Sequence, residues 1–150
     1  YVIAQFGGAI LGATFTWISY HSHFEMTEDK SLKLAVFCNA PAIRKTIPNL
    51  LTEIIATAIL VIAALGMSKP SSSLGTIDAL PIALVVLAIG LSMGGPTGYA
   101  INPARDLGPR IAHFILPIAG KGNSDWRYSW IPVIGPMIGA LLGFWIYGCC

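Results

Sequence analysis

Charged side chains are scarce in this chain of 150 residues, since Asp, Glu, Lys and Arg make up 11% of it and hydrophobic residues 55%. A soluble domain of this size carries about 25% charged residues, so the composition favours a membrane protein. The formal net charge is only +2, and the basic residues are scattered rather than gathered into a patch that would contact a phosphate backbone. We therefore expect no nucleic-acid partner.

Metal-binding and redox motifs are also absent. No CxxC pair or Cys/His spacing occurs among the three cysteines, which are Cys38, Cys149 and Cys150. The three histidines lack ligand spacing as well, and we expect them in loops or at interfaces. The sequence therefore predicts no metal, no cofactor and no catalytic residue, and the chain is not expected to be an enzyme.

Long uncharged windows are the strongest feature that remains. Three windows contain no charge and a fourth contains only Glu53; they are residues 1–24, 79–104, 128–150 and 46–68. About 20 apolar residues in a helix cross the roughly 30 Å of bilayer hydrocarbon, and Trp and Tyr near the window ends are typical of membrane interfaces. The pattern predicts four membrane-spanning helices, near residues 1–20, 48–67, 79–96 and 130–148.

Glycines recur in these windows at the spacing of packed helices. Gly8 and Gly12 form one GxxxG pair, and a longer series in the last window comprises Gly135, Gly139 and Gly143. Glycine lets helix backbones approach closely in lipid, where little hydrophobic force drives helices together. We interpret both series as packing sites in a tight bundle, without a chemical role. Residues 21–47 are expected to form a long charged loop between the first two helices.

The third window ends in a segment that does not fit a continuous helix. Residues 94–98 read Gly-Gly-Pro-Thr-Gly, which we interpret as irregular chain at membrane depth. Asn102 is a favoured N-cap and Pro103 suits the first helical turn, so a helix is predicted to begin there and to end before Pro117. At about 14 residues, or roughly 21 Å, it is too short to cross the bilayer. The sequence therefore predicts a half-helix over about 102–116 that begins inside the membrane.

Irregular backbone at this depth is tolerated where it is buried in protein or lines a water-filled path. The carbonyl groups of Gly98, Ala100 and Ile101 would offer hydrogen-bond acceptors, and the start of the half-helix would offer donors and about half a positive charge. Arg105 at this depth costs about 2.5–3.5 kcal/mol on insertion scales, so we interpret it as a cationic gate that holds solute oxygens and repels cations and protons. The alternative is an arginine whose charged end reaches the membrane interface.

Two acidic residues accompany these features. Glu53 is either a proton relay or, as we favour, a structural brace that accepts backbone N–H groups from the irregular segment before Asn102. Asp106 lies in the first turn of the half-helix, where it offsets the helix dipole and is placed to pair with Arg110 four residues on. Both carboxylates are therefore interpreted as structural support.

The run "MGGPTGYAINPARDLGPRI" resembles the second NPA box of the major intrinsic protein family, which comprises the aquaporins and glycerol facilitators. The four apolar windows resemble that family's third to sixth helices in order and loop length. The resemblance covers essentially the whole chain. It implies an all-α membrane protein with the aquaporin-like right-handed helix bundle, here four transmembrane spans plus one re-entrant half-helix, without the first two spans and the first half-helix.

The resemblance also implies a role for each residue of the motif. Asn102 would donate its amide to solute oxygens at the pore centre, and Pro103 and Ala104 would stack against their counterparts in the first half. Glu53 would hold the re-entrant loop. The selectivity filter would comprise Arg105, Tyr99 and Gly90.

Three positions distinguish the branches of the family. Strict water channels resemble one another in having a bulky histidine at the position of Gly90 and a small residue at the position of Asp106, directly after the filter arginine. With the aromatic wall of Tyr99, these residues resemble the glycerol-conducting branch. The chain departs from that branch in Gly95-Pro96, where Pro-Leu is usual, and in Tyr99, where Phe is frequent.

The function implied by the resemblance is a passive channel for glycerol and other small uncharged solutes, which also passes water and excludes ions and protons, in a homotetramer in the cell membrane. A secondary transporter with a broken helix is one alternative, and a non-conducting truncated remnant is another. The chain contains no first NPA box and begins with Tyr1. We therefore interpret residues 1–150 as the C-terminal two-thirds of such a channel, which alone should not enclose a pore.

Overall fold

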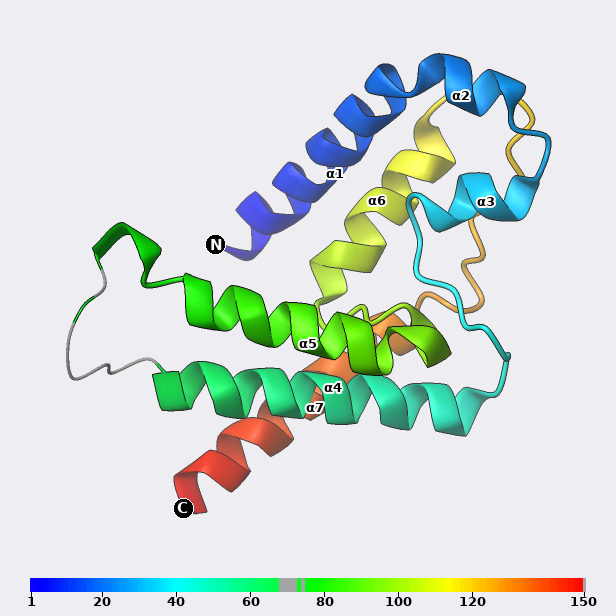
Figure 1. Ribbon diagram of the computed structural model, residues 1–150. Helices are drawn as coiled ribbons and strands as arrows, with labels where there is room; N and C mark the ends of the chain where they lie inside the picture. The colour runs from blue at the N-terminus through cyan, green and yellow to red at the C-terminus, as the bar shows by residue number, and fades with distance from the viewer. Residues whose placement is uncertain (68–72, 74, 150) are drawn as a thin grey trace.

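The computed structural model describes residues 1–67, 73 and 75–149, and Cys150 lies outside them. Their regular structure is helical throughout. The elements are α1 Val2–Ser19, α2 His21–Met26, α3 Lys30–Ala35, α4 Thr46–Met67, the short 3-10 helix η1 Gly75–Ile77, α5 Leu80–Thr97, α6 Pro103–Ile115 and α7 Ile131–Cys149 (Figure 1). Residues 21–47, expected as one loop, thus contain the two short helices α2 and α3.

Four segments are long and apolar enough to cross a bilayer: α1 with 18 residues, α4 with 22, Gly75–Thr97 with 23 and α7 with 19. At 1.5 Å per residue α4 extends about 33 Å, slightly more than the hydrocarbon core. Large apolar side chains such as Phe15, Leu91 and Phe144 are exposed on these helices, which suits a surface in lipid. Together with the half-helix α6, these four segments confirm the prediction of an all-α membrane protein with four spans and one half-helix.

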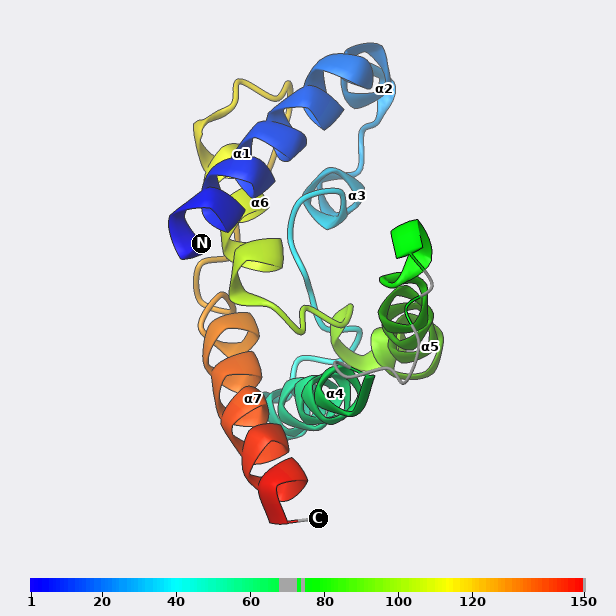
Figure 2. The same ribbon diagram turned by 90° about the vertical axis from the view of Figure 1, so that its left-hand side faces the viewer.

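The helices form two groups that meet at the start of α6. Figures 1 and 2 show α4 and α5 side by side, running in opposite directions, with α7 crossing α4 and α1 alongside α6. The most extensive helix contact is between α4 and α7, and the next is between α1 and α6. Because α6 also contacts α7, the short helix is fastened to both groups.

The glycines of α7 allow its close contact with α4. A Cβ atom built on Gly135 would lie 2.6 Å from the Cβ of Glu53, and one on Gly143 would lie 2.7 Å from the Ala58 carbonyl oxygen. A Cβ on Gly139 would overlap the Ile54 carbonyl group. The backbones of the two helices therefore touch along the whole glycine series, as the GxxxG spacing predicts.

The glycines of α1 behave differently from those of α7. No atom lies within 4 Å of a Cβ built on Gly8 or Gly12, so the expectation that this pair packs against another helix is not met among the described residues. The close contact of α1 is made instead through Gly108 of α6, whose Cβ would lie 2.6 Å from the Cβ of Ala9. Spacing alone did not distinguish a packed glycine pair from an open one.

The end of α5 corrects one sequence expectation. The helix continues through residues 94–97, with Pro96 inside it, whereas irregular chain was predicted there. Only Thr97 follows Pro96 in the helix, so the missing N–H group and the ring disturb the last turn alone. The chain leaves the helix at Gly98, which has φ +79° and donates its N–H to the Gly94 carbonyl at 2.8 Å. This left-handed end favours glycine.

Candidate functional site

The segment between α5 and α6 has an unusual backbone. Gly98, Tyr99 and Ile101 all have positive φ angles, of 79°, 43° and 44°, and a non-glycine residue in this region costs about 1–3 kcal/mol. Two such residues within three positions need a compensating interaction. That interaction comes from α4.

Glu53 supplies it. Its side chain is buried, and one carboxylate oxygen accepts hydrogen bonds from Thr97 Oγ1 at 2.6 Å and from the Ala100 N–H at 3.0 Å. The other oxygen accepts from the Ile101 N–H at 2.9 Å. Hydrogen bonds to a charged group contribute about 1.5–3 kcal/mol each, so three of them offset the cost of the left-handed residues. These are the backbone contacts expected of a brace rather than those of a proton relay.

The carbonyl groups of the segment are left for other partners. Those of Tyr99, Ala100 and Ile101 accept no hydrogen bond from the residues that the structure describes, and all three residues line a cavity. The Gly98 carbonyl, expected to be free, instead accepts a hydrogen bond from Asn39 Nδ2 at 2.5 Å. The free acceptors therefore begin one residue later than the sequence suggested.

Asn102 caps α6 and has a fixed orientation. Its Oδ1 accepts from the Ala104 N–H at 2.9 Å, as an N-cap does. The amide nitrogen consequently points away from the helix, where it donates to Gln5 Oε1 of α1 at 3.2 Å. Pro103 occupies the first helical position and lines the cavity, while Ala104 is buried. The cap thus turns the donor end of Asn102 toward the cavity wall.

Arg105 and Tyr99 lie together on that wall. The guanidinium carbon of Arg105 is 5.5 Å from the centre of the Tyr99 ring, a distance at which a cation is attracted to an aromatic face. Arg105 Nη1 also donates a hydrogen bond to Asn39 Oδ1. No carboxylate forms an ion pair with Arg105 among the described residues, so its charge is not neutralised.

Gly90 is placed against Tyr99 rather than against open space. A Cβ on Gly90 would lie 3.0 Å from Tyr99 Cζ, and one on Gly94 would lie 3.0 Å from Tyr99 Cδ1. The tyrosine ring thus lies in the space that the missing side chain of Gly90 leaves, and the filter role expected of Gly90 stays a prediction. Gly94, which sequence reasoning missed, lies against the same ring, and its only signal was the four-residue spacing from Gly90.

A buried ion pair fixes α6 from behind. Asp106 and Arg110 are both fully buried, with Arg110 Nη2 at 2.7 Å from Asp106 Oδ1 and Nε at 2.8 Å from Oδ2. Arg110 Nη1 also donates to the Ser124 and Asp125 carbonyls, at 2.7 and 2.9 Å. The pair therefore connects α6 with the α6–α7 loop.

The far end of α6 is capped by a lysine. Lys121 Nζ donates to the carbonyls of His113, Phe114 and Leu116 at 2.6, 2.8 and 2.5 Å. A cation there complements the negative end of the helix. Burial lowers the pKa of Lys121 from its ordinary value. With Asn102 at one end and Lys121 at the other, a helix of 13 residues is held at both termini.

The cavity has a volume of about 780 Å³. Its polar lining includes Gln5, Asn102, Arg105 and the 99–101 backbone, with Tyr1 and Thr57 beside them, and apolar residues on α4, α5 and α7 complete it, among them Leu60, Val61, Val86, Met137 and Ala140. Most of the polar groups thus come from α1 and residues 99–105, and most of the apolar groups come from α4, α5 and α7. Gln5 was not anticipated, and its only signal was a lone amide near the start of an uncharged helix.

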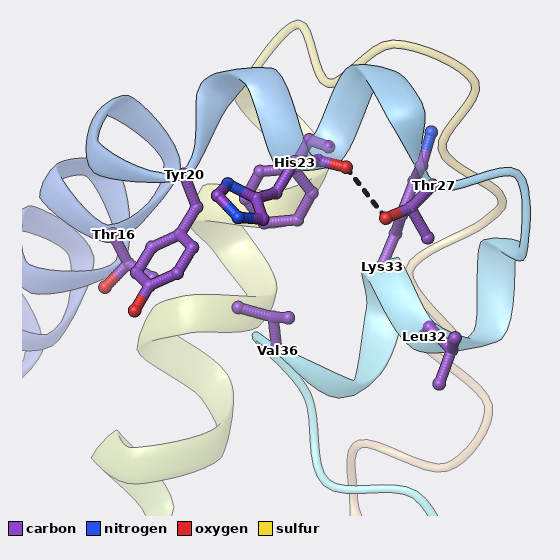
Figure 3. A pocket seen from close by; sticks show the side chains of 8 residues that line it. Thr16, Tyr20, His23, Thr27, Leu32, Lys33 and Val36 are labelled. Carbon is purple, nitrogen blue, oxygen red and sulfur yellow. Dashed lines mark hydrogen bonds between the residues drawn. The ribbon is translucent and has the colours of Figure 1, made fainter.

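A second hollow, of about 250 Å³, lies where α1 meets α2 and α3 (Figure 3). Its lining is mostly apolar, with Tyr20, Phe24, Leu32 and Val36 among the residues. The hydrogen bond drawn in Figure 3 joins Thr27 Oγ1 to the backbone carbonyl of His23. No set of polar groups converges on this hollow, so the larger cavity is the candidate site.

Several known proteins have sequences similar to that of this chain. The family model described as Major intrinsic protein matches residues 1–147. A probable glycerol uptake facilitator protein of Thermotoga maritima is 52% identical over 147 residues, which cover 98% of this chain and 62% of that protein. A glycerol uptake facilitator protein of Streptococcus pneumoniae is 48% identical over 149 residues, with coverage of 98% and 62%.

A D/L-lactic acid transporter of Lactiplantibacillus plantarum is 41% identical over 149 residues, which cover 97% of this chain and 62% of that protein. The chain thus spans about three-fifths of the length of these curated relatives. The match of the family model over nearly the whole chain, and these identities, confirm the resemblance noted from the NPA motif and show that the chain belongs to the major intrinsic protein family of multi-pass membrane channels.

Proposed function

We propose that the protein containing this chain is a passive membrane channel for glycerol and similar small uncharged solutes, and that it is not an enzyme. The observation that carries this proposal is the division of the cavity into a hydrogen-bonding side and an apolar side. The carbonyls of Tyr99, Ala100 and Ile101 accept, and Asn102 and Arg105 donate. A polyol has the matching shape, because its hydroxyl groups lie along one edge and its carbon chain along the other.

Glu53 makes this arrangement possible. By accepting the N–H groups of Ala100 and Ile101, it leaves their carbonyl groups to turn toward the solute. A hydroxyl group that leaves water needs both an acceptor and a donor, since an unpaired buried polar group costs about 1–3 kcal/mol. The 99–101 carbonyls and the Asn102 amide supply these partners in sequence along the path.

Charge selectivity is proposed to come from Arg105 and the start of α6. A helix N-terminus carries about half a positive charge, and Arg105 adds a full charge that no carboxylate of the described residues neutralises. Cations and protons are repelled by such a field, whereas neutral solutes are held by the guanidinium donors. Water, which is smaller than glycerol and also neutral, is expected to pass.

The chain lies in the membrane as several spans, and we propose the cell membrane as its location. Exposed apolar residues cover α1, α5 and α7, which suits lipid and neighbouring subunits. We propose a homotetramer, following the family resemblance. Pro103 and Ala104 are proposed to stack against a matching half-helix.

Glycerol is favoured as the solute because the relatives from Thermotoga maritima and Streptococcus pneumoniae described above are named for glycerol uptake. Lactic acid is the second candidate, since one relative is named a D/L-lactic acid transporter. Both are small molecules with hydrogen-bonding groups on a short carbon chain. In its uncharged form, lactic acid fits the same two-sided cavity.

The test is stopped-flow light scattering on vesicles that contain the full-length gene product. With a glycerol gradient, the vesicles should shrink and then swell again much faster than protein-free vesicles. With a sucrose gradient they should only shrink. Glycerol recovery equal to that of protein-free vesicles would contradict the proposal and favour a non-conducting remnant. Recovery that requires a sodium or proton gradient would favour a secondary transporter.

A further inference from the structure

Asn39 lies in the connection between α3 and α4, far from the NPA motif in sequence. It is only 3% exposed, although the connection runs at the end of the bundle (Figure 1). Every polar group of this residue, on the backbone and on the side chain, is hydrogen-bonded to the candidate site. The backbone and the side chain have different partners.

The backbone of Asn39 seats the connection against α6. Its N–H donates to Asp106 Oδ1 at 2.7 Å, and its carbonyl accepts from Arg110 Nη2 at 3.0 Å. These two bonds join it to the buried ion pair of Asp106 and Arg110. Because they involve only main-chain atoms of Asn39, they do not depend on which side chain stands at this position.

The side chain of Asn39 bridges two parts of the cavity wall. Its Nδ2 donates to the Gly98 carbonyl at 2.5 Å, and its Oδ1 accepts from Arg105 Nη1. The space for this bridge depends on glycine, since a Cβ on Gly98 would lie 2.8 Å from Asn39 Nδ2. One amide therefore joins the left-handed turn before the carbonyl segment to the charged group beyond it.

We propose that Asn39 is the positioning residue of the selectivity arginine, and this inference rests on the function proposed above. The side chain holds the Arg105 guanidinium in one orientation at a fixed place relative to the 99–101 carbonyls. Without it, the contact with the Tyr99 ring is the one interaction of the guanidinium that remains among the described residues. A mobile arginine would no longer present the same donors to each passing solute.

The chemistry of an amide suits this task better than that of a carboxylate. An aspartate at position 39 would accept from Arg105 but would neutralise the charge that repels cations. The nearest carboxylate along the chain, Asp106, does not neutralise it either, because its oxygens are bonded to Arg110 and to the Asn39 N–H. Asn39 therefore orients a cation without cancelling its field.

The experiment uses the full-length gene product with Asn39→Leu, which keeps the size of the side chain and removes its hydrogen bonds to Arg105, to the Gly98 carbonyl and, at 3.5 Å, to the Thr97 carbonyl. Asn39→Asp keeps the acceptor for Arg105 and adds a charge. Asn123→Leu is the matched control, because Asn123 is an exposed asparagine whose side chain contacts only the Asp125 N–H. The reactivity of Arg105 toward phenylglyoxal is measured by peptide mass spectrometry, and glycerol and sodium fluxes are measured in vesicles.

In Asn39→Leu we expect Arg105 to react about tenfold faster, which corresponds to about 1.4 kcal/mol, and the preference for glycerol over the longer polyol xylitol to fall. In Asn39→Asp we expect Arg105 to stay protected while sodium leakage rises. The control should match the parent in every measurement. Cys38 should remain unreactive toward maleimide in all variants, since burial raises the pKa of its thiol to about 12 and the backbone bonds of Asn39 remain.

Unchanged Arg105 reactivity in Asn39→Leu would overturn the inference, and so would equal increases in Asn39→Leu and Asn39→Asp. Exposure of Cys38 in Asn39→Leu would also overturn it, because the side chain would then seat the whole connection. The reactivity of Arg105 does not depend on which solute passes. A parent protein that conducts no glycerol would therefore contradict the proposed function while the chemical measurement still decides the role of Asn39.

Discussion

The two buried carboxylates of the site, Glu53 and Asp106, are stabilised in different ways. Glu53 on α4 forms no ion pair with the residues that the structure describes and accepts from one hydroxyl and two backbone N–H groups. Asp106 on α6 forms a two-pronged ion pair with Arg110 and accepts one backbone N–H. Both are closed to solvent, since Glu53 is 1% and Asp106 is 0% exposed.

The difference follows from what each carboxylate holds. Glu53 holds the segment that lines the cavity, where a second cation would alter the field proposed for Arg105, and backbone N–H groups satisfy the carboxylate without adding a cation. Asp106 lies behind α6, where a cation is harmless and an arginine reaches two loops at once. Among the described residues, the side of α6 toward the cavity therefore has one unpaired positive charge, that of Arg105. On the opposite side the charges of Asp106 and Arg110 cancel.

Removing the cation from the pair should have the largest effect. Arg110→Met leaves Asp106 buried without its partner, and breaking such a pair costs about 3–5 kcal/mol. We expect a large fall in the thermal unfolding midpoint of the detergent-solubilised protein. The double variant Arg110→Met with Asp106→Leu should recover much of the loss, because no charge is then left unpaired. A single variant as stable as the parent would show that the pair is not needed.

Glu53→Gln should have the next largest effect and a different character. Glutamine offers one oxygen and one donating NH₂ to three donors, so at least one of them loses its acceptor, at about 1–3 kcal/mol. The left-handed segment loses support, and glycerol flux should fall severalfold even in protein that remains folded. Glu25→Gln, on a half-exposed glutamate of α2, is the control. Equal flux in the two variants would refute the bracing role.

An ion pair in which the arginine is exposed and the carboxylate, at 14% exposed, is half-buried should show the smallest effect. Arg44 pairs with Asp125 at 2.6 Å, but its side chain is 58% exposed. The Asp125 carboxylate raises the pKa of Arg44, yet exposed pairs contribute about 0–1 kcal/mol and are screened by salt. Arg44→Gln should therefore lower the unfolding midpoint slightly at low salt and not at high salt. A fall in the unfolding midpoint as large as that of Arg110→Met would mean that burial does not determine how much each ion pair contributes to stability.

The fold was largely predictable from the pattern of charge. Windows without charge marked α1, α5 and α7, and a window with Glu53 as its one charge marked α4, because a span in lipid excludes most charged side chains whatever its tertiary contacts. The start of α6 was predictable from Asn102 and Pro103, whose capping preferences are local. Residues 94–97 were predicted wrongly, since the low helix propensity of Gly-Gly-Pro was overridden at the end of the long apolar helix α5.

The site was predictable only in part. Asn102, Arg105 and Glu53 stood out because polar groups in an apolar window need a reason. Asn39 did not, because an asparagine in a charged loop is ordinary until the loop is folded against α6. Gly94 and Gln5 were missed because their partners, Tyr99 and Asn102, lie next to them only in the folded chain. The same GxxxG spacing describes Gly8 and Gly12, which are open, and Gly139 and Gly143, which are packed, so spacing does not reveal a partner.

The central claim is that the cavity beside residues 99–105 is the path of glycerol, and cysteine labelling on α7 tests it most directly. Met137 lines the cavity, while its neighbour Ile138 does not; both are exposed, at 55% and 43%. Met137→Cys and Ile138→Cys are compared in the full-length gene product with Cys149→Ser and Cys150→Ser. Treatment with a methanethiosulfonate ethylammonium reagent should reduce glycerol flux severalfold in Met137→Cys and leave it unchanged in Ile138→Cys. Equal inhibition of both variants, or of neither while both are labelled, would contradict the account.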